Sequence, residues 1–266
     1  MSTQPIEIVV TDLDGTLWAA EGQVADATRA ALRQLDRRGI PVLAATGRRL
    51  RSARMALVRA DLALMPCVGL NGALAADHGQ RFHSATFTVD DARAVYDIFV
   101  AGGVTPVGYL VPQRDGDSID SIAAEGVSTH PDHLAALAPT LSSAPIDFVE
   151  MVAFSVLGVP YSLLDPIRAT IELRDAADCV LSRDRAYGDH NLAATSRGVT
   201  KWTGVLAYCE RYGIDATRVL AIGDDDNDVT MLKNASVGLA MTHASPGAIA
   251  VAAATVDSWT RVLDYV

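Results

Sequence analysis

Two aspartates that stand one residue apart follow an apolar stretch near the start of the chain. Residues 8–10 are typical of a buried strand, and Asp12, Asp14, Gly15 and Thr16 come after it. In extended backbone the two carboxylates point the same way, and they repel each other unless they share a proton or a cation. Because such hard oxygen ligands suit Mg²⁺, we predict a magnesium site here. The alternative is an Asp-Gly turn in which Thr16 caps the next element.

A second acidic group follows another apolar stretch late in the chain. Residues 218–222 predict a buried strand, and Gly223, Asp224, Asp225, Asn227 and Asp228 come directly after it. Acids of this kind can also cap a helix in a solvated loop. The carboxyl ends of parallel strands meet at one edge of a sheet, where ligands bind. We therefore expect Asp224 to lie near Asp12 and to bind the same metal ion.

Three more polar positions stand where predicted elements begin or end. Thr46, Gly47 and Arg48 follow a predicted strand at 40–45, and Asn71 follows another at 67–70. Lys201 falls in the first turn of a helix that Thr200 can cap, and it is one of only two lysines in the chain. A compact ammonium suits a tight phosphate site. The plain alternatives are a surface role for Arg48 and a turn-forming role for Asn71.

The composition excludes several classes of protein. The chain has 266 residues, of which 50% are hydrophobic, and this is typical of a globular protein with ample core. A net charge of −10 argues against nucleic acid or an anionic membrane as the partner. No apolar run is long enough to span a membrane, and we see no signal peptide, so we expect a cytoplasmic protein. The three cysteines are scattered and predict reduced thiols.

The order of predicted elements indicates an α/β fold with two domains. Strands and helices alternate with short connections up to about residue 72 and again from about residue 200, which predicts a doubly wound, Rossmann-like parallel sheet. Residues 1–82 and 191–266 form this core, and residues 83–190 form an inserted α/β cap domain. Within the insertion we expect helices from residue 90 to 103 and from 166 to 174. We expect strands at 104–111, 146–159 and 179–182, and a loop at 112–121.

These motifs resemble those of the haloacid dehalogenase superfamily of phosphohydrolases. The four motifs of that family are matched in order by Asp12-Leu-Asp14-Gly-Thr, by Thr46, by Lys201 and by Gly223-Asp224-x-x-Asn227-Asp228. The space between the first two motifs fits no cap, so the long insertion begins after Asn71. That placement is similar to the Cof-type branch, subclass IIB, which is rich in sugar phosphatases.

The resemblance implies a role for each matched residue. Asp12 would attack phosphorus and form an aspartyl-phosphate, and Asp14 would protonate the leaving oxygen and then activate water. Mg²⁺ would be held by Asp12, Asp224 and the backbone carbonyl of Asp14. Thr46 and Lys201 would bind the phosphoryl oxygens, Lys201 would also hold Asp12 in position, and Asn227 or Asp228 would orient Lys201 and the metal waters. Beside these matched residues, we expect further contacts with the substrate from Gly47, Arg48 and Asn71.

Two positions depart from the family pattern. Asp225 stands where the family has a small residue, and Thr242-His243 replaces the usual Gly-Asn. His243 is either a substitute hydrogen-bonding group at the site or a surface residue. The sequence does not decide which polar side chains of the insertion face the substrate; the candidates are Arg114, Asp117, Glu150, Arg183 and His190.

Three functions are compatible with these motifs. The first is a Mg²⁺-dependent phosphatase acting on a small phosphorylated metabolite such as a sugar phosphate. The second is a phosphotransferase or phosphomutase on the same fold. The third is a receiver-like phosphate-binding module, against which Asp14 argues, because a signalling module gains nothing from a general acid. We expect a small-molecule partner, neither nucleic acid nor membrane, and a monomer or homodimer.

Overall fold

The computed structural model of the protein describes residues 5–112, 119–184 and 186–266. The chain forms two compact units, one that runs to His83 and resumes at Thr200, and one that spans Ser84–Val199. Each unit encloses its own cluster of buried apolar side chains. The second unit ends later than residue 190, because residues 190–195 form a strand of its sheet. Arg114 and Asp117 lie outside the described residues.

The first unit is built on an eight-stranded sheet in the order β14-β13-β12-β1-β2-β3-β4-β5. The six strands from β14 to β3 run parallel, as the alternating pattern predicts, and β4 pairs antiparallel with β3. The strands are β1 (Ile8–Thr11), β2 (Val42–Ala45), β3 (Cys67–Gly69), β4 (Leu74–Asp77), β5 (Gln80–Ser84), β12 (Val219–Gly223), β13 (Val237–Met241) and β14 (Ala254–Val256).

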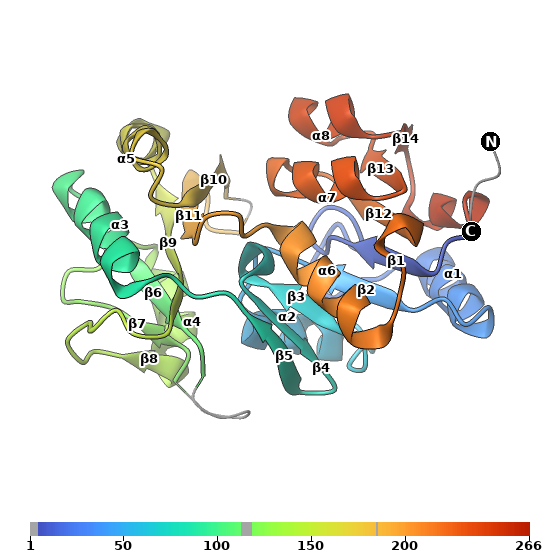
Figure 1. Ribbon diagram of the computed structural model, residues 1–266, viewed down its shortest axis with the longest axis horizontal. Coiled ribbons are helices and arrows are strands. Elements are labelled where there is room, and N and C mark those ends of the chain that lie inside the picture. The colour runs from blue at the N-terminus through green and yellow to red at the C-terminus, as the bar shows by residue number, and fades with distance from the viewer. Residues whose placement is uncertain (1–4, 113–118, 185) are drawn as a thin grey trace. The chain divides into compact units, whose positions relative to one another are not determined.

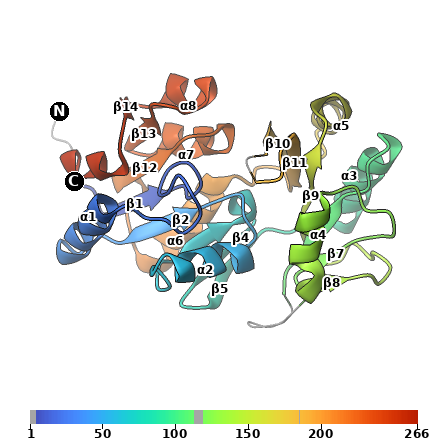
Figure 2. The ribbon, with the colours of Figure 1, turned by 180° about the vertical axis from the view of Figure 1, so that it is seen from behind.

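Helices cover both faces of this sheet. Figures 1 and 2 show α6 over one face and α1 and α2 over the other. The sheet is buried on both sides, which explains why β1 and β12 contain only buried residues. The helices are α1 (Asp26–Arg37), α2 (Leu50–Arg59), α6 (Lys201–Tyr212), α7 (Val229–Asn234) and α8 (Pro246–Val251), with short 3₁₀ turns at Leu70–Gly72, Ala216–Arg218, Asp226–Asp228 and Trp259–Asp264.

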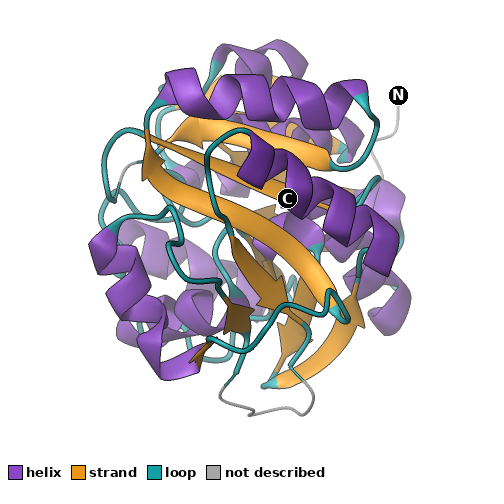
Figure 3. Cartoon of the chain, turned by 90° about the vertical axis from the view of Figure 1, so that its left-hand side faces the viewer, coloured by secondary structure: helices purple, strands orange, loops and turns teal. Residues whose placement is uncertain are grey.

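The second unit is built on a six-stranded sheet in the order β10-β11-β9-β6-β7-β8. It is antiparallel except for the pair β7 and β8. Helices α3 and α5 contact its strands, and Figure 3 shows long helices lying over strands. Its elements are α3 (Val89–Ala101), β6 (Val107–Leu110), β7 (Ser121–Ile122), α4 (Pro131–Leu137), a 3₁₀ turn at Ala138–Thr140, β8 (Leu141–Ser142), β9 (Met151–Val159), α5 (Tyr161–Leu173), β10 (Asp178–Arg183) and β11 (His190–Thr195).

Several predicted bounds in the second unit are wrong. The strand predicted at 146–159 begins only at Met151, and α5 begins five residues earlier than predicted. Pro166 lies inside α5, although proline is disfavoured in a helix interior because it lacks an N–H group. The sequence therefore predicts a helix start at Pro166. Tertiary packing overrides that local preference, since Leu164 and Ile167 of the same helix are buried.

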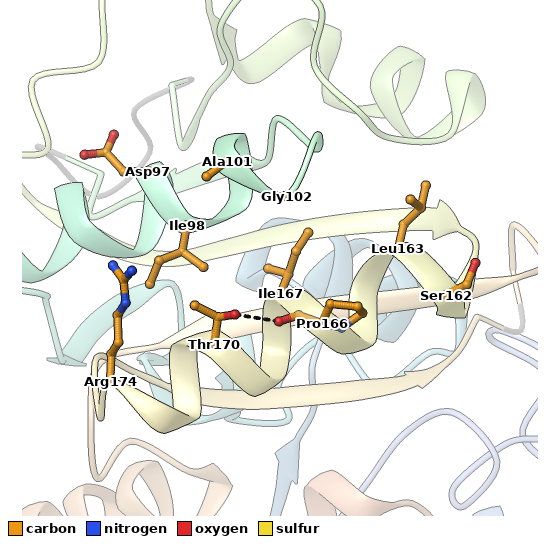
Figure 4. A pocket seen from close by; sticks show the side chains of 10 residues that line it. All are labelled: Asp97, Ile98, Ala101, Gly102, Ser162, Leu163, Pro166, Ile167, Thr170 and Arg174. Carbon is orange, nitrogen blue, oxygen red and sulfur yellow. Dashed lines mark hydrogen bonds between the residues drawn. The ribbon is translucent and has the colours of Figure 1, made fainter.

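A cavity of about 450 Å³ lies between α3 and α5 (Figure 4). Ile98 and Ile167 line its middle, and Asp97 and Arg174 lie at one end. The hydroxyl of Thr170 donates to the carbonyl of Pro166 at 2.8 Å within α5. The cavity belongs wholly to the second unit, whereas the acidic strand ends belong to the first. None of the helices in the described part of the chain has the length and hydrophobicity that crossing a membrane requires.

Candidate active site

The carboxyl end of β1 positions Asp12 at the middle of the parallel sheet. Its backbone N–H donates to the carbonyl of Ile222 in β12 at 3.0 Å, so the aspartate is tied to the neighbouring strand. Only 6% of the surface of Asp12 is exposed. One oxygen of its carboxylate, Oδ1, accepts a hydrogen bond from Nζ of Lys201 at 2.6 Å. Asp12, which follows β1, therefore contacts Lys201 at the start of α6.

Lys201 is completely buried and bridges two carboxylates. Its Nζ donates to Asp12 and, at 2.7 Å, to Oδ1 of Asp228. Thr200 begins α6 with a capping box in which the side chain of Thr203 accepts from its N–H, and this fixes the first turn that carries the lysine. Burial disfavours the charged ammonium, but the attraction of Asp12 and Asp228 outweighs it and raises the pKa of Lys201. Lys201 is therefore a fixed cation.

Asp228 uses both of its oxygens within the protein. While Oδ1 accepts from Lys201, Oδ2 accepts from the backbone N–H groups of Asp224 and Asp225 at 2.9 and 3.0 Å. Its carboxyl group lies over Gly223, where a Cβ would come within 2.4 Å of Cγ of Asp228. A glycine is thus required at the end of β12. Asp228 thus contacts Lys201 and holds the loop after β12, and its predicted role in orienting Lys201 and the metal waters stays a prediction.

The oxygens of Asp12, Asp224 and Asp228 form a buried acidic cluster, in which one ligand atom of each lies within 4.8 Å of the others. Asp224 is 1% exposed, and its Oδ1 accepts from the hydroxyl of Thr16 at 2.8 Å. Burial, opposed by the attraction of Lys201, raises the pKa of Asp12 well above its ordinary value, and repulsion from Asp228 and Asp224 adds to the rise. Three carboxylates against one ammonium leave excess negative charge here. This donor set fits a divalent cation with oxygen ligands.

Asp14 does not share this cluster, because the chain turns before it. β1 ends at Thr11, and the N–H of Trp18 closes a tight turn onto the carbonyl of Leu13 at 3.1 Å. Asp14 therefore lies beyond the extended strand, within this turn, and the backbone from Asp12 to Asp14 is not the continuous strand that the sequence predicts. The predicted metal contact of Asp14 concerns its backbone carbonyl, and it stays a prediction.

The carboxylate of Asp14 is held by Arg48 and Trp18. Nε and Nη2 of Arg48 donate to its two oxygens at 2.5 and 2.7 Å, and Nε1 of Trp18 donates to Oδ1 at 3.0 Å. Burial would raise the pKa of Asp14, but these hydrogen bonds and the charge of Arg48 together lower it. The guanidinium of Arg48 thus contacts Asp14, and substrate binding by Arg48 stays a prediction.

Thr46, Gly47, Asn71 and Asn227 come together beside Arg48. The N–H of Asn71 donates to the carbonyl of Thr46 at 3.2 Å, and Nδ2 of Asn227 donates to Oδ1 of Asn71 at 3.1 Å. A Cβ on Gly47 would lie 3.1 Å from Oδ1 of Asn71, so a glycine suits this close approach. Within the described residues, Oδ1 of Asn227 is buried without a hydrogen-bond partner. Four of the predicted site residues therefore meet here, around an acceptor atom that could take a hydrogen bond from a water molecule or a hydroxyl group.

Asn71 reaches this place through a strained turn. It has a φ of 52°, and Leu70 before it has a φ of 49°. Gly72 continues the turn with a φ of 106°, and a Cβ on it would lie 1.8 Å from the carbonyl oxygen of Thr200. Left-handed backbone at non-glycine residues costs about 1–3 kcal/mol each and is concentrated at functional sites. The turn is therefore wedged against the start of α6 and holds Asn71 in place.

The two departures from the family pattern both lie at the acidic cluster. Asp225 accepts from the N–H of Asp226 at 2.8 Å and begins the 3₁₀ turn Asp226–Asp228; burial and the neighbouring acids raise its pKa. Nε2 of His243 lies 2.8 Å from the carbonyl oxygen of Gly15 and 3.8 Å from Oδ2 of Asp224. Because a carbonyl only accepts, Nε2 donates. His243 is thus a hydrogen-bonding group beside the cluster.

Sequence reasoning missed two residues that contact the predicted site. Trp18 donates to Asp14, and Glu21 accepts from Nη1 of Arg48 at 2.5 Å. Both lie in the loop between β1 and α1, where no periodic pattern or motif marks them. A tryptophan and a glutamate in a loop carry no signal by themselves. Only the geometry of the loop reveals their contacts.

Comparison with known proteins defines the class of this chain. A family profile described as haloacid dehalogenase-like hydrolase matches residues 9–133 and 161–261. A phosphoglycolate phosphatase of Methanopyrus kandleri is 30% identical over 258 residues, which cover 94% of this chain and 90% of that protein. The chain therefore belongs to the haloacid dehalogenase-like hydrolases, in their Cof-type branch.

Two further matches agree with this assignment. The 5-amino-6-(5-phospho-D-ribitylamino)uracil phosphatase YitU of Bacillus subtilis is 28% identical, over 91% of this chain and 88% of its own length. A solved haloacid dehalogenase subclass IIB sugar phosphatase has the same fold, with a TM-score of 0.73 at 17% identity, covering 97% of this chain and 98% of that one. Phosphatases of the family generally depend on a metal ion.

Proposed function

We propose that this phosphatase hydrolyses phosphate monoesters of small metabolites, such as sugar phosphates, with Mg²⁺ bound and through an aspartyl-phosphate on Asp12. The observation that carries the proposal is the completely buried Lys201, which contacts Asp12 at 2.6 Å inside the buried acidic cluster. A carboxylate fixed by a buried ammonium is placed as a nucleophile, and the ammonium balances the charge that phosphoryl transfer brings. The relatives named as phosphatases support the same reaction class.

Asp12 forms the new bond in this proposal. An oxygen of its carboxylate bonds to phosphorus as the ester P–O bond breaks, and Lys201 keeps that carboxylate in one orientation. Mg²⁺ held by Asp12, Asp224 and the Asp14 carbonyl would screen the negative charges of nucleophile and phosphate. Thr46 and Lys201 bind the phosphoryl oxygens, Asn71 is a further contact with the substrate, and Asn227 and Asp228 orient Lys201 and the metal waters.

Asp14 moves the proton in both halves of the reaction. It protonates the leaving oxygen in the first half, and in the second it takes a proton from the water that attacks the aspartyl-phosphate. A receiver module has no use for this second carboxylate. Replacing Asp14 by Asn should abolish turnover of alkyl phosphates.

The second unit, Ser84–Val199, sets which ester is accepted in this proposal. Its helices α3 and α5 contact the strands, and it contains no buried group of metal-ligating acids among its described residues. Such a unit can recognise the alcohol part of a substrate without taking part in the chemistry. Exchange of residues 84–199 for the matching segment of a relative should change the preferred ester and leave the requirement for Asp12 intact.

The proposal is tested by phosphate release from a panel of phosphate monoesters. The panel contains phosphoglycolate, hexose and pentose phosphates and p-nitrophenyl phosphate, each with Mg²⁺ or with EDTA, for wild type and Asp12→Asn. We expect release that needs the metal and disappears in the variant. Release that survives in Asp12→Asn would refute the nucleophile. Release that appears only when a sugar acceptor is added would identify a phosphotransferase instead.

A further inference from the structure

Four side chains of alternating charge lead outward from the predicted acid-base residue. Asp14 binds Arg48 through two hydrogen bonds, Arg48 binds Glu21 at 2.5 Å, and Glu21 pairs with Arg59 of α2. Asp14 and Glu21 are each 36% exposed at the side chain, and Arg48 is 24% exposed. We call these four residues the arginine network. It lies entirely within the first unit.

The guanidinium of Arg48 is held from two sides. Its Nε and Nη2 donate to Asp14, whereas Nη1 donates to Oε2 of Glu21. Its backbone is also fixed, because the N–H donates to the hydroxyl of Thr46 at 3.2 Å and the carbonyl accepts from Leu70 at 2.8 Å. Since a guanidinium is planar, two carboxylates on different edges determine its orientation.

Glu21 is anchored in turn by α2. Its Oε1 pairs with Nη2 of Arg59, the last residue of that helix. Gly22 follows with a φ of 74°, and a Cβ on it would lie 3.4 Å from Cβ of Arg59, so the loop passes close to the helix. The loop between β1 and α1 is thereby tied to a rigid element. Because Glu21 is held by α2, its carboxylate can keep the guanidinium of Arg48 in one orientation.

We propose that Glu21 is a positioning residue for proton transfer by Asp14, acting through Arg48. This inference rests on the proposed function. In the first half of the reaction, the ester P–O bond breaks, Asp14 in its protonated form gives its proton to the leaving oxygen, and Arg48 holds the carboxylate that remains. In the second half, an attacking water gives its proton to that carboxylate as its oxygen bonds to phosphorus and the bond from Asp12 to phosphorus breaks.

The geometry explains why a residue outside the site matters. A general acid must lie within about 3 Å of the atom that it protonates. Asp14 lies in a turn and is one-third exposed, so the turn alone leaves its carboxylate room to move. Nε1 of Trp18 donates to Oδ1, and the two hydrogen bonds from Arg48 hold both oxygens while Arg48 itself is oriented. Without Glu21, one edge of the guanidinium loses its partner, and Arg48 holds the carboxylate of Asp14 less firmly.

The test compares two kinds of leaving group. p-Nitrophenolate departs without a proton, whereas an alkoxide needs one, so only alkyl esters depend on Asp14 as an acid. We would measure kcat/KM of wild type and Glu21→Gln with p-nitrophenyl phosphate and with the alkyl phosphate that the panel shows to be hydrolysed fastest. Glu7→Gln is the matched control, since Glu7 is a 32% exposed glutamate that pairs with Arg218 far along the chain.

We expect Glu21→Gln to lower kcat/KM for the alkyl ester by about tenfold, a part of the 10²–10⁴-fold that general acid catalysis contributes. The value for p-nitrophenyl phosphate should change by less than about twofold, and Glu7→Gln should leave both unchanged. Glu21→Asp, which keeps the charge on a shorter side chain, should fall between Glu21→Gln and wild type for the alkyl ester.

Three results would overturn the inference. Equal losses for both esters would show that Glu21 affects substrate binding or folding, and a wild-type value for the alkyl ester would show that it has no role. An increase of KM alone would mean that Arg48 binds the phosphate directly. A wild type without activity on either ester refutes the proposed function instead, so the two failures are distinguishable. Thermal unfolding of each variant verifies that it is folded.

Discussion

The two charged groups of the first unit begin two residues apart and differ in almost every physical respect. The buried acidic cluster contains Asp12, Asp224 and Asp228, each at most 6% exposed, around the completely buried Lys201. The arginine network runs from Asp14 toward solvent through side chains that are between 24% and 53% exposed. The turn after β1 separates Asp12, which lies in the buried acidic cluster, from Asp14, which lies in the arginine network. Burial thus assigns different chemistry to similar residues.

The buried acidic cluster concentrates charge, whereas the arginine network fixes the orientation of one carboxylate. Charges removed from water cost several kcal/mol unless they are paired, so the buried acidic cluster is sensitive to the loss of Lys201, the cation that Asp12 and Asp228 share. Half-exposed ion pairs contribute only about 0–1 kcal/mol, so the arginine network adds little to stability. It does fix the orientation of Asp14, because an arginine that donates two parallel hydrogen bonds holds a carboxylate in one direction. We therefore expect mutations in the two groups to have separate effects on folding and on catalysis.

Removal of the buried cation should have the largest effect. Lys201→Met leaves Asp12 and Asp228 buried without their shared partner, which costs about 3–5 kcal/mol of unfolding free energy. Phosphate release should also fall by about a thousandfold. Urea unfolding in EDTA and the phosphate assay measure the two effects. Lys233→Met, at the other and exposed lysine, is the control, and equal stability of the two variants would contradict the difference in burial.

Replacing Arg48 by lysine should slow catalysis and leave the stability of the fold almost unchanged. Arg48→Lys keeps the charge but cannot donate two parallel hydrogen bonds to Asp14. We expect kcat/KM for the alkyl ester to fall about tenfold while the unfolding free energy changes by less than about 1 kcal/mol. Enzyme kinetics and urea unfolding on the same preparation verify this. A large loss of stability would mean that the arginine network holds the fold together.

Neutralising the nucleophile should stabilise the metal-free protein. The pKa of Asp12 is raised in the folded state, chiefly by burial, so its proton is bound more tightly there than in the unfolded chain. Ionised Asp12 therefore opposes folding as the pH rises through that raised pKa, and the penalty is absent below the ordinary pKa of an aspartate. In EDTA, Asp12→Asn should have a higher Tm than wild type at neutral pH, with the gap closing in acid. A gap that widens in acid would contradict this sign.

Loss of the outermost charge should have the smallest effect. Arg59 is 53% exposed and contacts Glu21 from outside the site. Arg59→Gln should lower kcat/KM for the alkyl ester by about twofold and change the unfolding free energy by less than about 0.5 kcal/mol. Side-by-side kinetics with Glu21→Gln sharpen the comparison. An effect larger than that of Glu21→Gln would mean that the contacts of Arg59, and not the orientation of Arg48, matter.

The sequence predicts the parallel core well because its pattern is local. Apolar stretches that end in polar residues mark β1, β2, β3 and β12, and Thr200 followed by Lys201 marks the start of α6. The second unit was harder to predict from the sequence. β7 and β8 have two residues each, and α5 contains a proline, so neither length nor propensity identifies them. Their pairing depends on tertiary contacts.

For the site, too, the sequence pattern predicts contacts between strand ends but not contacts that depend on tertiary structure. The matched motifs predict that Asp12, Lys201, Asp224 and Asp228 meet, because parallel strand ends share one edge of the sheet. The contacts of Asp14 could not be predicted, since they depend on a turn after Thr11 and on the rotamer of Arg48. The contact of Glu21 with Arg48 can be identified only when the loop between β1 and α1 is placed against α2. Residues that act through others leave no local pattern.

The central claim is that Asp12 carries the phosphoryl group, and acid quenching during turnover tests it most directly. Wild type and Asp12→Asn would be mixed with p-nitrophenyl phosphate and Mg²⁺, quenched in acid within the first turnover, and digested for mass spectrometry. The account predicts a phosphoryl group on the wild-type peptide that contains Asp12, and none in the variant. Phosphate release by wild type with the phosphoryl group on another residue, or release by the variant at the wild-type rate, would contradict it.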